Sequence, residues 1–313
     1  MRTIVGPGAI GDIVRSVQQE LTGVGFDTNG IDGWFGQVTA NALKQFQAAK
    51  GLAATGVVDD ATWTPLMRAP IPETTQRSLQ LTASFEGHGF GLAVGNFDGA
   101  LLTWGIIGFT LASSEIQEIV LAMNQAHPEL VRQAFQSYTD ELLHLMTAPR
   151  DFQKKWADEH TINGHALADP WKGMFAAFGA SPEVQAEQLK HVQQDYFNPA
   201  IRTARALNFT SELGLALCFD IHVQNGGIKN TAMQQIQQQA KPEMAEQAQR
   251  VIVANAVADW ANPSWADNVR RRKLTVATGQ GTVNGHTYVL ENWGLSGSFN
   301  AAELVSAAAG GAP

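Results

Sequence analysis

Two carboxylic side chains stand where the regular pattern of the sequence breaks, and as a pair they could perform acid–base chemistry. Glu86 ends the apolar stretch 79–85, where its carboxyl group would be partly desolvated and would keep a proton, as a general acid must. Asp98 follows twelve residues later, within the turn sequence Asn-Phe-Asp-Gly. Cleavage of a glycosidic bond needs such a pair, because one carboxyl protonates the leaving oxygen while the other activates water or attacks carbon. Spacing alone leaves a second interpretation open, since acidic residues near turns are usually solvated surface groups.

The segments that must position these carboxylates are mostly helical. Apolar periodicity predicts helices over residues 76–85, 114–126, 128–147, 183–198, 200–208, 210–224, 232–240 and 242–261. Ser113 or Ser114 suits the N-cap of the second of these helices, with Glu115 in its first turn. Only residues 97–110 and 282–291 look extended. We therefore expect a helical domain with a small β element near residues 97–110.

Residues 9–67 are organised differently, as three short predicted helices separated by glycine turns. Asp32-Gly33 is a strong turn signal between the first two helices, and Gly51 ends the second. The segment 55–63 then repeats the Gly-apolar-Asp pattern of the earlier turn, and Asp59 or Asp60 would serve as the N-cap of the third helix. This internal repeat indicates a small module built from two similar turns.

The order and spacing of these residues resemble the three-helix peptidoglycan-binding domain of cell-wall hydrolases. The likeness covers residues 9–67 and rests on Val17-Gln18 with Leu21, Asp32-Gly33-x-Phe35-Gly36-x-x-Thr39, Phe46-Gln47 and Gly51-Leu52. The resemblance implies a non-catalytic anchor on peptidoglycan. Its wall-binding residues would be Asp32, Trp34, Phe35 and Trp63, because exposed aromatic side chains beside turns could stack on sugar or peptide. The alternative is that the glycines and aromatic residues only close a small helical core.

The larger region resembles glycoside hydrolase family 46, the chitosanases, and related lysozyme-like muramidases. The likeness spans about residues 78–280 and rests on Ser84-Phe-Glu86, Asp98-Gly-x-x-x-Thr103-x-Gly-Ile-Ile-Gly-Phe-Thr110, Tyr196-Phe-Asn-Pro-Ala200 and Gly226-Gly-Ile-Lys-Asn-Thr-Ala-Met233. The resemblance implies that Glu86 is the general acid, that Asp98 is the general base, and that Thr103 helps to position the attacking water. Because this family inverts configuration, the resemblance also implies carboxyl groups roughly 6.5–9.5 Å apart with a water between them.

The same resemblance assigns further residues to the substrate and to a supporting charge network. Glu115 matches an acidic subsite residue, and Asp220 matches a buried aspartate tied to arginines. Arg272 is the arginine expected there, although three consecutive arginines leave the register open. Glu115, Asp220, Asn225 and Arg272 are all expected among the substrate-binding residues. The chain departs from typical chitosanases in the shorter interval between its two carboxylates, which carries Gly-His-Gly-Phe-Gly, and in the apolar run 101–104. Because the loop between the carboxylates borders the cleft, the substrate could differ even where the mechanism persists.

Composition excludes several classes of protein. Of 313 residues, 44% are hydrophobic and 16% are charged, so the chain is neither disordered nor fibrous. No apolar run is long enough to span a bilayer, and the single cysteine, Cys218, excludes an intramolecular disulfide and a thiolate metal cluster. The eight histidines form no metal-binding pattern, so we expect no metal. The net charge of −8 argues against binding to nucleic acid, whose phosphates attract cationic surfaces.

These observations together predict a mainly α protein: a small three-helix domain at 1–68, a proline-stiffened linker at 69–76, and a larger lysozyme-like α+β domain at 77–313 that is mostly helical. We expect a monomeric inverting N-acetylmuramidase that needs no cofactor, binds bacterial peptidoglycan, and binds neither nucleic acid nor membrane. No signal peptide is recognisable at the N-terminus. The protein would therefore be made in the cytoplasm and act at the cell wall, as a phage endolysin or an exported effector.

Two other functions stay open at this stage. A chitosanase is the first, and the net charge of −8 favours it because chitosan is cationic, although salt screens such long-range attraction. The second is a non-catalytic wall-binding protein with a degenerate lysozyme-like domain. The presence of Glu86, Asp98 and Thr103 argues against that second alternative.

Overall fold

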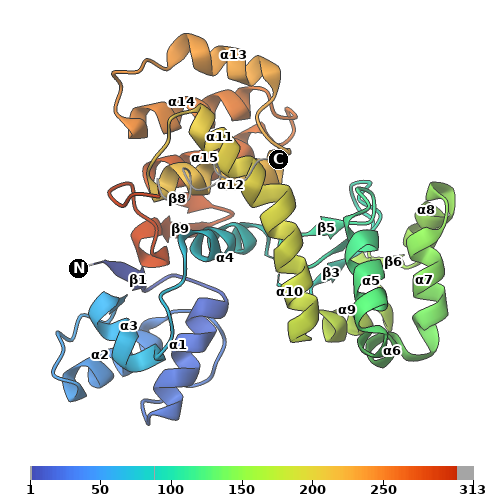
Figure 1. Ribbon diagram of the computed structural model, residues 1–313, viewed down its shortest axis with the longest axis horizontal. Coiled ribbons are helices and arrows are strands. Elements are labelled where there is room, and N and C mark those ends of the chain that lie inside the picture. The colour runs from blue at the N-terminus through green and yellow to red at the C-terminus, as the bar shows by residue number, and fades with distance from the viewer. Residues whose placement is uncertain (1, 88, 302–313) are drawn as a thin grey trace. The chain divides into compact units, whose positions relative to one another are not determined.

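The computed structural model describes residues 2–87 and 89–301, and it is mainly helical, as the sequence predicts. The chain divides into two compact units, one made of Met1–Phe85 with Tyr196–Pro313 and the other of Glu86–Asp195. Figure 1 colours the second unit from teal through green to yellow, and the first from blue to cyan at one end of the chain and from yellow to red at the other. His88 lies outside the described residues.

The first unit holds both ends of the described chain. Its elements are β1 (Thr3–Val5), α1 (Asp12–Gly23), α2 (Gln37–Ala49), β2 (Val58–Asp59), α3 (Asp60–Met67), α4 (Thr74–Glu86, whose last residue belongs to the second unit), α11 (Asn198–Ala206), α12 (Glu212–Asn225), α13 (Asn230–Gln239), α14 (Glu246–Asp259), α15 (Ala266–Thr278), β8 (Gln280–Val283), β9 (His286–Val289) and the 3-10 turn η3 (Leu290–Trp293).

Two buried glutamines hold the turns of the N-terminal module in the same way. The amide of Gln18 donates to Asp32 and accepts from the backbone N–H of Gly33, both at 2.8 Å. The amide of Gln47 donates to the carbonyl oxygen of Val57 and accepts from the N–H of Gly56, both at 2.9 Å. Buried turn backbone needs such partners. The internal repeat of the sequence is therefore built as two turns, each held by one glutamine.

A buried carboxylate joins the N-terminal module to the rest of the first unit. Glu212, at the start of α12, is 1% exposed and accepts hydrogen bonds from Arg2 and from Arg77, the latter at 2.8 Å. The backbone N–H of Gly6 also donates to the carbonyl oxygen of Asn292 at 2.8 Å. Because α4 begins at Thr74, the last three residues of the predicted linker 69–76 are helical.

Helix α12 is the core helix of the first unit. Residues 212–221 are all buried, so this helix is enclosed on every side, as a helix apolar all round should be. The hydroxyl of Ser211 accepts from the N–H of Gly214 and caps its start, and Gly226 ends it in the left-handed conformation. Helices α11, α14 and α15 pack against it. This packing fixes the direction of the turn that follows Gly226.

The second unit combines a small antiparallel sheet with helices. Its elements are β3 (Ala93–Val94), β4 (Thr103–Trp104), β5 (Phe109–Thr110), α5 (Glu115–Ala126), α6 (Pro128–Phe135), η1 (Gln136–Tyr138), α7 (Thr139–Thr147), α8 (Arg150–Glu159), β6 (Thr161–Ile162), β7 (Ala166–Leu167), α9 (Trp171–Gly179), α10 (Pro182–His191) and the π turn η2 (Val192–Phe197), whose last two residues belong to the first unit. The strand order is β5-β4-β3-β7-β6, which confirms a small β element and places part of it outside the predicted segment 97–110.

Aromatic side chains form the core of the second unit. Trp104 is fully buried, its indole N–H donates to the carbonyl oxygen of Phe175 at 3.1 Å, and its ring stacks on Phe178 with centroids 5.6 Å apart. Such pairs stabilise a core beyond the area that they bury. The apolar run 101–104, which the sequence contrasts with chitosanases, therefore belongs to this core. No helix in the described ranges is long and apolar enough to cross a membrane.

Two helices predicted as continuous are interrupted. The predicted helix 128–147 breaks at Gln136, whose φ of 48° is incompatible with a helix, and η1 joins α6 to α7. The predicted helix 183–198 ends at His191 and continues as the wider turn η2. Neither break carries a proline or glycine, so local sequence gave no signal for it. Helices α8, α9 and α15 have no counterpart among the predicted elements.

Candidate active site

Glu86 is the last residue of α4, and a glycine fixes its position. Gly87 follows in the left-handed conformation, with φ 67°, which ends the helix without the strain that a side chain would bring. Glu86 itself is half-buried. Further along the loop, a Cβ on Gly91 would lie 2.7 Å from the carbonyl oxygen of Ala176. The glycines of this loop thus end the helix at the candidate acid and let the chain pass close to α9.

Asp98 lies in a turn that its own side chain and Asn96 hold in place. One Asp98 carboxylate oxygen accepts a hydrogen bond from the backbone N–H of Ala100 at 3.1 Å. The side-chain oxygen of Asn96 accepts one from the backbone N–H of Leu101 at 3.2 Å. The Asn96 amide donates to Asp158 on α8 at 2.7 Å, which ties the turn to the helix. Asp98 remains exposed. An exposed carboxylate on a fixed turn is suited to contact a water molecule.

Thr103 and Glu115 both contact Thr110 on strand β5. Thr103 lies on β4, where it pairs with Val94 on β3 and with Thr110 on β5, and it is 9% exposed. A carboxylate oxygen of Glu115, the first residue of α5, accepts from the backbone N–H of Thr110 at 2.9 Å. Glu115 therefore fixes the strand beside Thr103. Glu86, Asp98, Thr103 and Glu115 all belong to the second unit.

Asp220 is a fully buried anion held by two cations of α15. The carboxylate accepts from Arg272 at 2.7 Å, from Lys273 at 2.5 Å and from the hydroxyl of Thr82 at 3.1 Å. Burial alone would raise the pKa of the Asp220 carboxyl, but the two cations outweigh it and lower that pKa to about 2. Of the consecutive arginines, Arg272 faces Asp220, whereas Arg270 pairs with Asp259. Lys273 is the member of this network that sequence reasoning missed.

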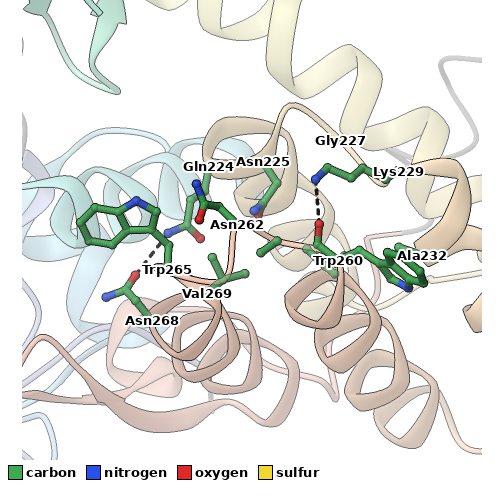
Figure 2. A pocket seen from close by; sticks show the side chains of 12 residues that line it. Gln224, Asn225, Gly227, Lys229, Ala232, Trp260, Asn262, Trp265, Asn268 and Val269 are labelled. Carbon is green, nitrogen blue, oxygen red and sulfur yellow. Dashed lines mark hydrogen bonds between the residues drawn. The ribbon is translucent and has the colours of Figure 1, made fainter. Parts of the chain in front are cut away.

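This network is closed off from solvent. Asp220 is 0% exposed, Arg272 is 3% exposed and Lys273 is 0% exposed, and their ion pairs hold α12 against α15. Asn225, at the end of α12, differs, because it lines a pocket of the first unit together with two exposed tryptophans, Trp260 and Trp265 (Figure 2). Neither tryptophan was predicted, since a sequence does not tell an exposed indole from a core one.

The wall-binding residues predicted in the N-terminal module separate into exposed and buried ones. Trp34 is 57% exposed and open to a ligand. Asp32 is exposed, but its carboxylate accepts from Gln18 and from the backbone of Trp34, so it shapes the turn. Phe35 and Trp63 are 1% and 3% exposed, so both are core residues of this module and offer little surface to a ligand. The Trp63 indole N–H is also occupied by the carbonyl oxygen of Ala69.

Other reactive groups give no second candidate centre. Burial raises the pKa of the Cys218 thiol, which is 0% exposed and therefore unsuited to act as a nucleophile. Across residues 2–87 and 89–301, no group of three or more histidine, cysteine or acidic side chains is placed to hold a metal ion. The candidate catalytic groups therefore remain the carboxylates of Glu86 and Asp98 in the second unit.

Comparison with known proteins assigns both parts of the chain. The sequence model of the peptidoglycan binding domain matches residues 10–66, and that of glycosyl hydrolase family 46 matches residues 84–256. No curated protein matches the chain.

Solved structures with a similar fold are chitosanases. The native chitosanase from Bacillus subtilis MY002 has a TM-score of 0.51 and 18% identity over 71% of this chain and 99% of its own, and its mutant complexed with 6 GlcN has the same values. The chitosanase of Gynuella sunshinyii with chitotetraose has a TM-score of 0.49 and 15% identity over the same shares. At these identities the likeness concerns the fold. With more than half of its length matched by the family model, the chain belongs to glycosyl hydrolase family 46, and it carries a peptidoglycan-binding domain N-terminal to its glycoside hydrolase domain.

Proposed function

We propose that the protein is a peptidoglycan hydrolase that cleaves the β-1,4 bond between N-acetylmuramic acid and N-acetylglucosamine. The observation that carries this proposal is the conjunction, in one chain, of a peptidoglycan-binding domain and a glycoside hydrolase domain. A module that binds the wall raises the local concentration of that polymer around the catalytic domain. Trp34, which directly follows the first turn of the module and is 57% exposed, supports a wall contact there.

The mechanism that we propose is inverting acid–base hydrolysis. Half-buried Glu86 protonates the leaving oxygen, and exposed Asp98 takes a proton from the attacking water. The hydroxyl of Thr103 helps to position that water. Two carboxyl groups and a water complete this reaction, so the proposal includes no cofactor. Glu86→Gln should lower turnover by about 10²–10⁴-fold and leave wall binding unchanged.

The proposed division of the chain is a wall anchor at 1–68, a linker at 69–76 and a catalytic domain at 77–313. The contact of Arg2 with Glu212 indicates that the anchor is held by more than the linker. Deleting residues 1–70 would remove Arg2 from a buried carboxylate and disturb the catalytic domain as well. A point variant at Trp34 therefore tests the anchor more cleanly. We propose that the protein acts as a monomer at the bacterial cell wall, as an endolysin or an exported effector.

A chitosanase is the second candidate, because the solved structures of similar fold carry that name and the net charge of −8 attracts a cationic polymer. The two functions differ in the sugar bound and share their carboxylates. The experiment is to measure new reducing ends released from purified peptidoglycan and from chitosan at equal protein concentration. Faster release from peptidoglycan is expected, and release from chitosan alone would overturn the proposal.

A further inference from the structure

A pocket of about 240 Å³ opens in the first unit between two connections of the chain. The end of α12 contributes Asn225, the turn after it contributes Gly227, and the connection from α14 to α15 contributes Trp260 and Trp265. Gly227 has a φ of 108°, which lets the turn follow the pocket wall without a side chain. A pocket of this volume suits one sugar ring better than an extended chain.

Two exposed indoles stand at the ends of this pocket. Trp260 is 45% exposed and Trp265 is 64% exposed, although tryptophan is highly buried on average. In Figure 2 the amide side chains of Gln224, Asn225 and Asn262 lie between the two indoles. Flat apolar rings beside convergent polar groups match a pyranose, which has apolar C–H faces and a polar rim of hydroxyls.

The amides of the pocket are oriented to bind a neutral polar group. Buried Lys273 donates to the side-chain oxygen of Gln224 at 2.7 Å. The side-chain nitrogen of Gln224 therefore points the opposite way and donates to the side-chain oxygen of Asn268 at 3.4 Å. Within the described part of the chain, the buried side-chain oxygen of Asn225 accepts no hydrogen bond. An acceptor buried without a donor is costly, and a ligand N–H reached by a small rotation of the amide would satisfy it.

The charge of the pocket is wrong for a glucosamine cation. None of its lining residues is acidic, and its single charged group is Lys229, whose ammonium donates to the carbonyl oxygen of Trp260 at 2.7 Å. Two carboxylates adjoin lining residues in sequence: Asp259 is engaged by Arg270 and Gln235, and Asp267, beside Asn268, is exposed and is not among the lining residues. A protonated amine would meet a like charge here and gain only a weak cation–π contact with an exposed indole.

We propose that this pocket binds an N-acetylated hexosamine residue, with its ring against an indole and its acetamido group among the amides. The acetamido group offers one donor and one acceptor, which the carbonyl oxygen of Asn225 and the N–H groups of Gln224 complement. The assignment rests on the proposed function, since peptidoglycan supplies such residues. The assignment adds to the proposed function the chemical class of sugar that the pocket selects, which is a neutral N-acetylated hexosamine rather than a protonated glucosamine.

The test measures binding by the full-length Glu86→Gln variant of N-acetylglucosamine tetramer and of glucosamine tetramer, by calorimetry at pH 6. The N-acetylated tetramer should bind at least about tenfold more tightly, and Trp265→Ala should weaken that binding by about tenfold or more. Phe152→Ala removes an aromatic residue that is 40% exposed on α8 and serves as the matched control, with no change expected. Equal binding of both tetramers, or unchanged binding by Trp265→Ala, would overturn the assignment.

A second variant, Asn262→Asp, tests whether an added carboxylate increases the binding of glucosamine tetramer. The Asn262 carbonyl oxygen accepts from the backbone N–H of Ser264 at 3.0 Å, a bond that aspartate also makes, so Asn262→Asp adds a carboxylate and keeps the turn. Glucosamine tetramer should then bind at least about fivefold more tightly, and no gain would count against the pocket. The proposed function fails separately: a protein that hydrolyses only chitosan refutes it, while selective binding of the N-acetylated tetramer would still stand.

Discussion

Replacing Asp220 by asparagine should destabilise the protein strongly, because it leaves two buried cations without their counter-charge. The carboxylate is 0% exposed and accepts hydrogen bonds from Arg272, Lys273 and Thr82. Asparagine has nearly the same shape and can keep one or two of these bonds. What the substitution removes is the negative charge, so its effect measures the ionic part of the network.

The size of the effect follows from two independent estimates. The pKa of Asp220 is lowered from 3.8 to about 2, and at 1.36 kcal/mol per pKa unit this difference corresponds to about 2–3 kcal/mol. Removing one partner of a buried ion pair costs about 3–5 kcal/mol. We therefore expect Asp220→Asn to lower the free energy of unfolding by about 3–4 kcal/mol, a large part of the 5–15 kcal/mol that is typical of proteins.

The dependence on pH has a definite sign. Because the folded pKa of Asp220 lies below the unfolded value, the unfolded chain binds more protons between the two, and stability rises with pH there. The contribution of this carboxylate is complete above about pH 4 and is lost as pH falls towards 2. The difference between wild type and Asp220→Asn should therefore shrink over that window.

Urea denaturation followed by tryptophan fluorescence measures both effects. Arg270→Ala is the matched control, because it breaks an ion pair with Asp259 whose side chains are 35% and 40% exposed, and it should cost less than about 1 kcal/mol. A loss below 1 kcal/mol for Asp220→Asn at pH 7 would refute the reasoning. So would a difference between wild type and variant that does not change between pH 4 and pH 2.

Three further predictions concern other parts of the chain. Trp34→Ala should reduce sedimentation with purified cell walls by about tenfold, whereas Val38→Ala, an equally exposed apolar site, should not; equal losses would contradict a role for the indole. Gly179→Ala should lower the thermal midpoint, because its Cβ would lie 2.1 Å from the carbonyl oxygen of Phe90, and an unchanged midpoint would mean that the loop yields freely. Burial, with Arg202 nearby, lowers the pKa of His222, so the unfolded chain takes up its proton first and stability falls below about pH 6.5; His222→Gln should flatten that part of the stability curve.

Much of the fold could be predicted because local chemistry and packing agree. Asp59 was one of two expected N-caps of α3, and its carboxylate accepts from the N–H of Thr62 at 2.8 Å. Ser114 stands at the predicted start of α5, yet its hydroxyl makes no capping bond, and Glu115 binds the neighbouring strand instead. The position followed from sequence, while the bond depended on a strand that only the tertiary structure brings near.

In the candidate site, too, local sequence predicted positions but not the contacts that depend on tertiary structure. Glu86 and Asp98 could be named because a helix end and an Asn-Phe-Asp-Gly turn leave local signals. The burial of Phe35 and Trp63 could not be predicted, because the sequence beside a turn is the same whether an aromatic residue faces solvent or core. Lys273 could not be predicted, since its burial depends on Asp220, which lies 53 residues earlier in the chain.

The measurement that tests the central claim most directly is the identity of the new reducing-end sugar after digestion of purified peptidoglycan. The digest is reduced with borohydride and hydrolysed, and the reduced sugars are identified by mass spectrometry, with Glu86→Gln as the blank. The proposed muramidase yields reduced muramic acid in wild-type digests only. Digests in which reduced glucosamine forms instead, or in which wild type and Glu86→Gln give the same trace, would contradict it.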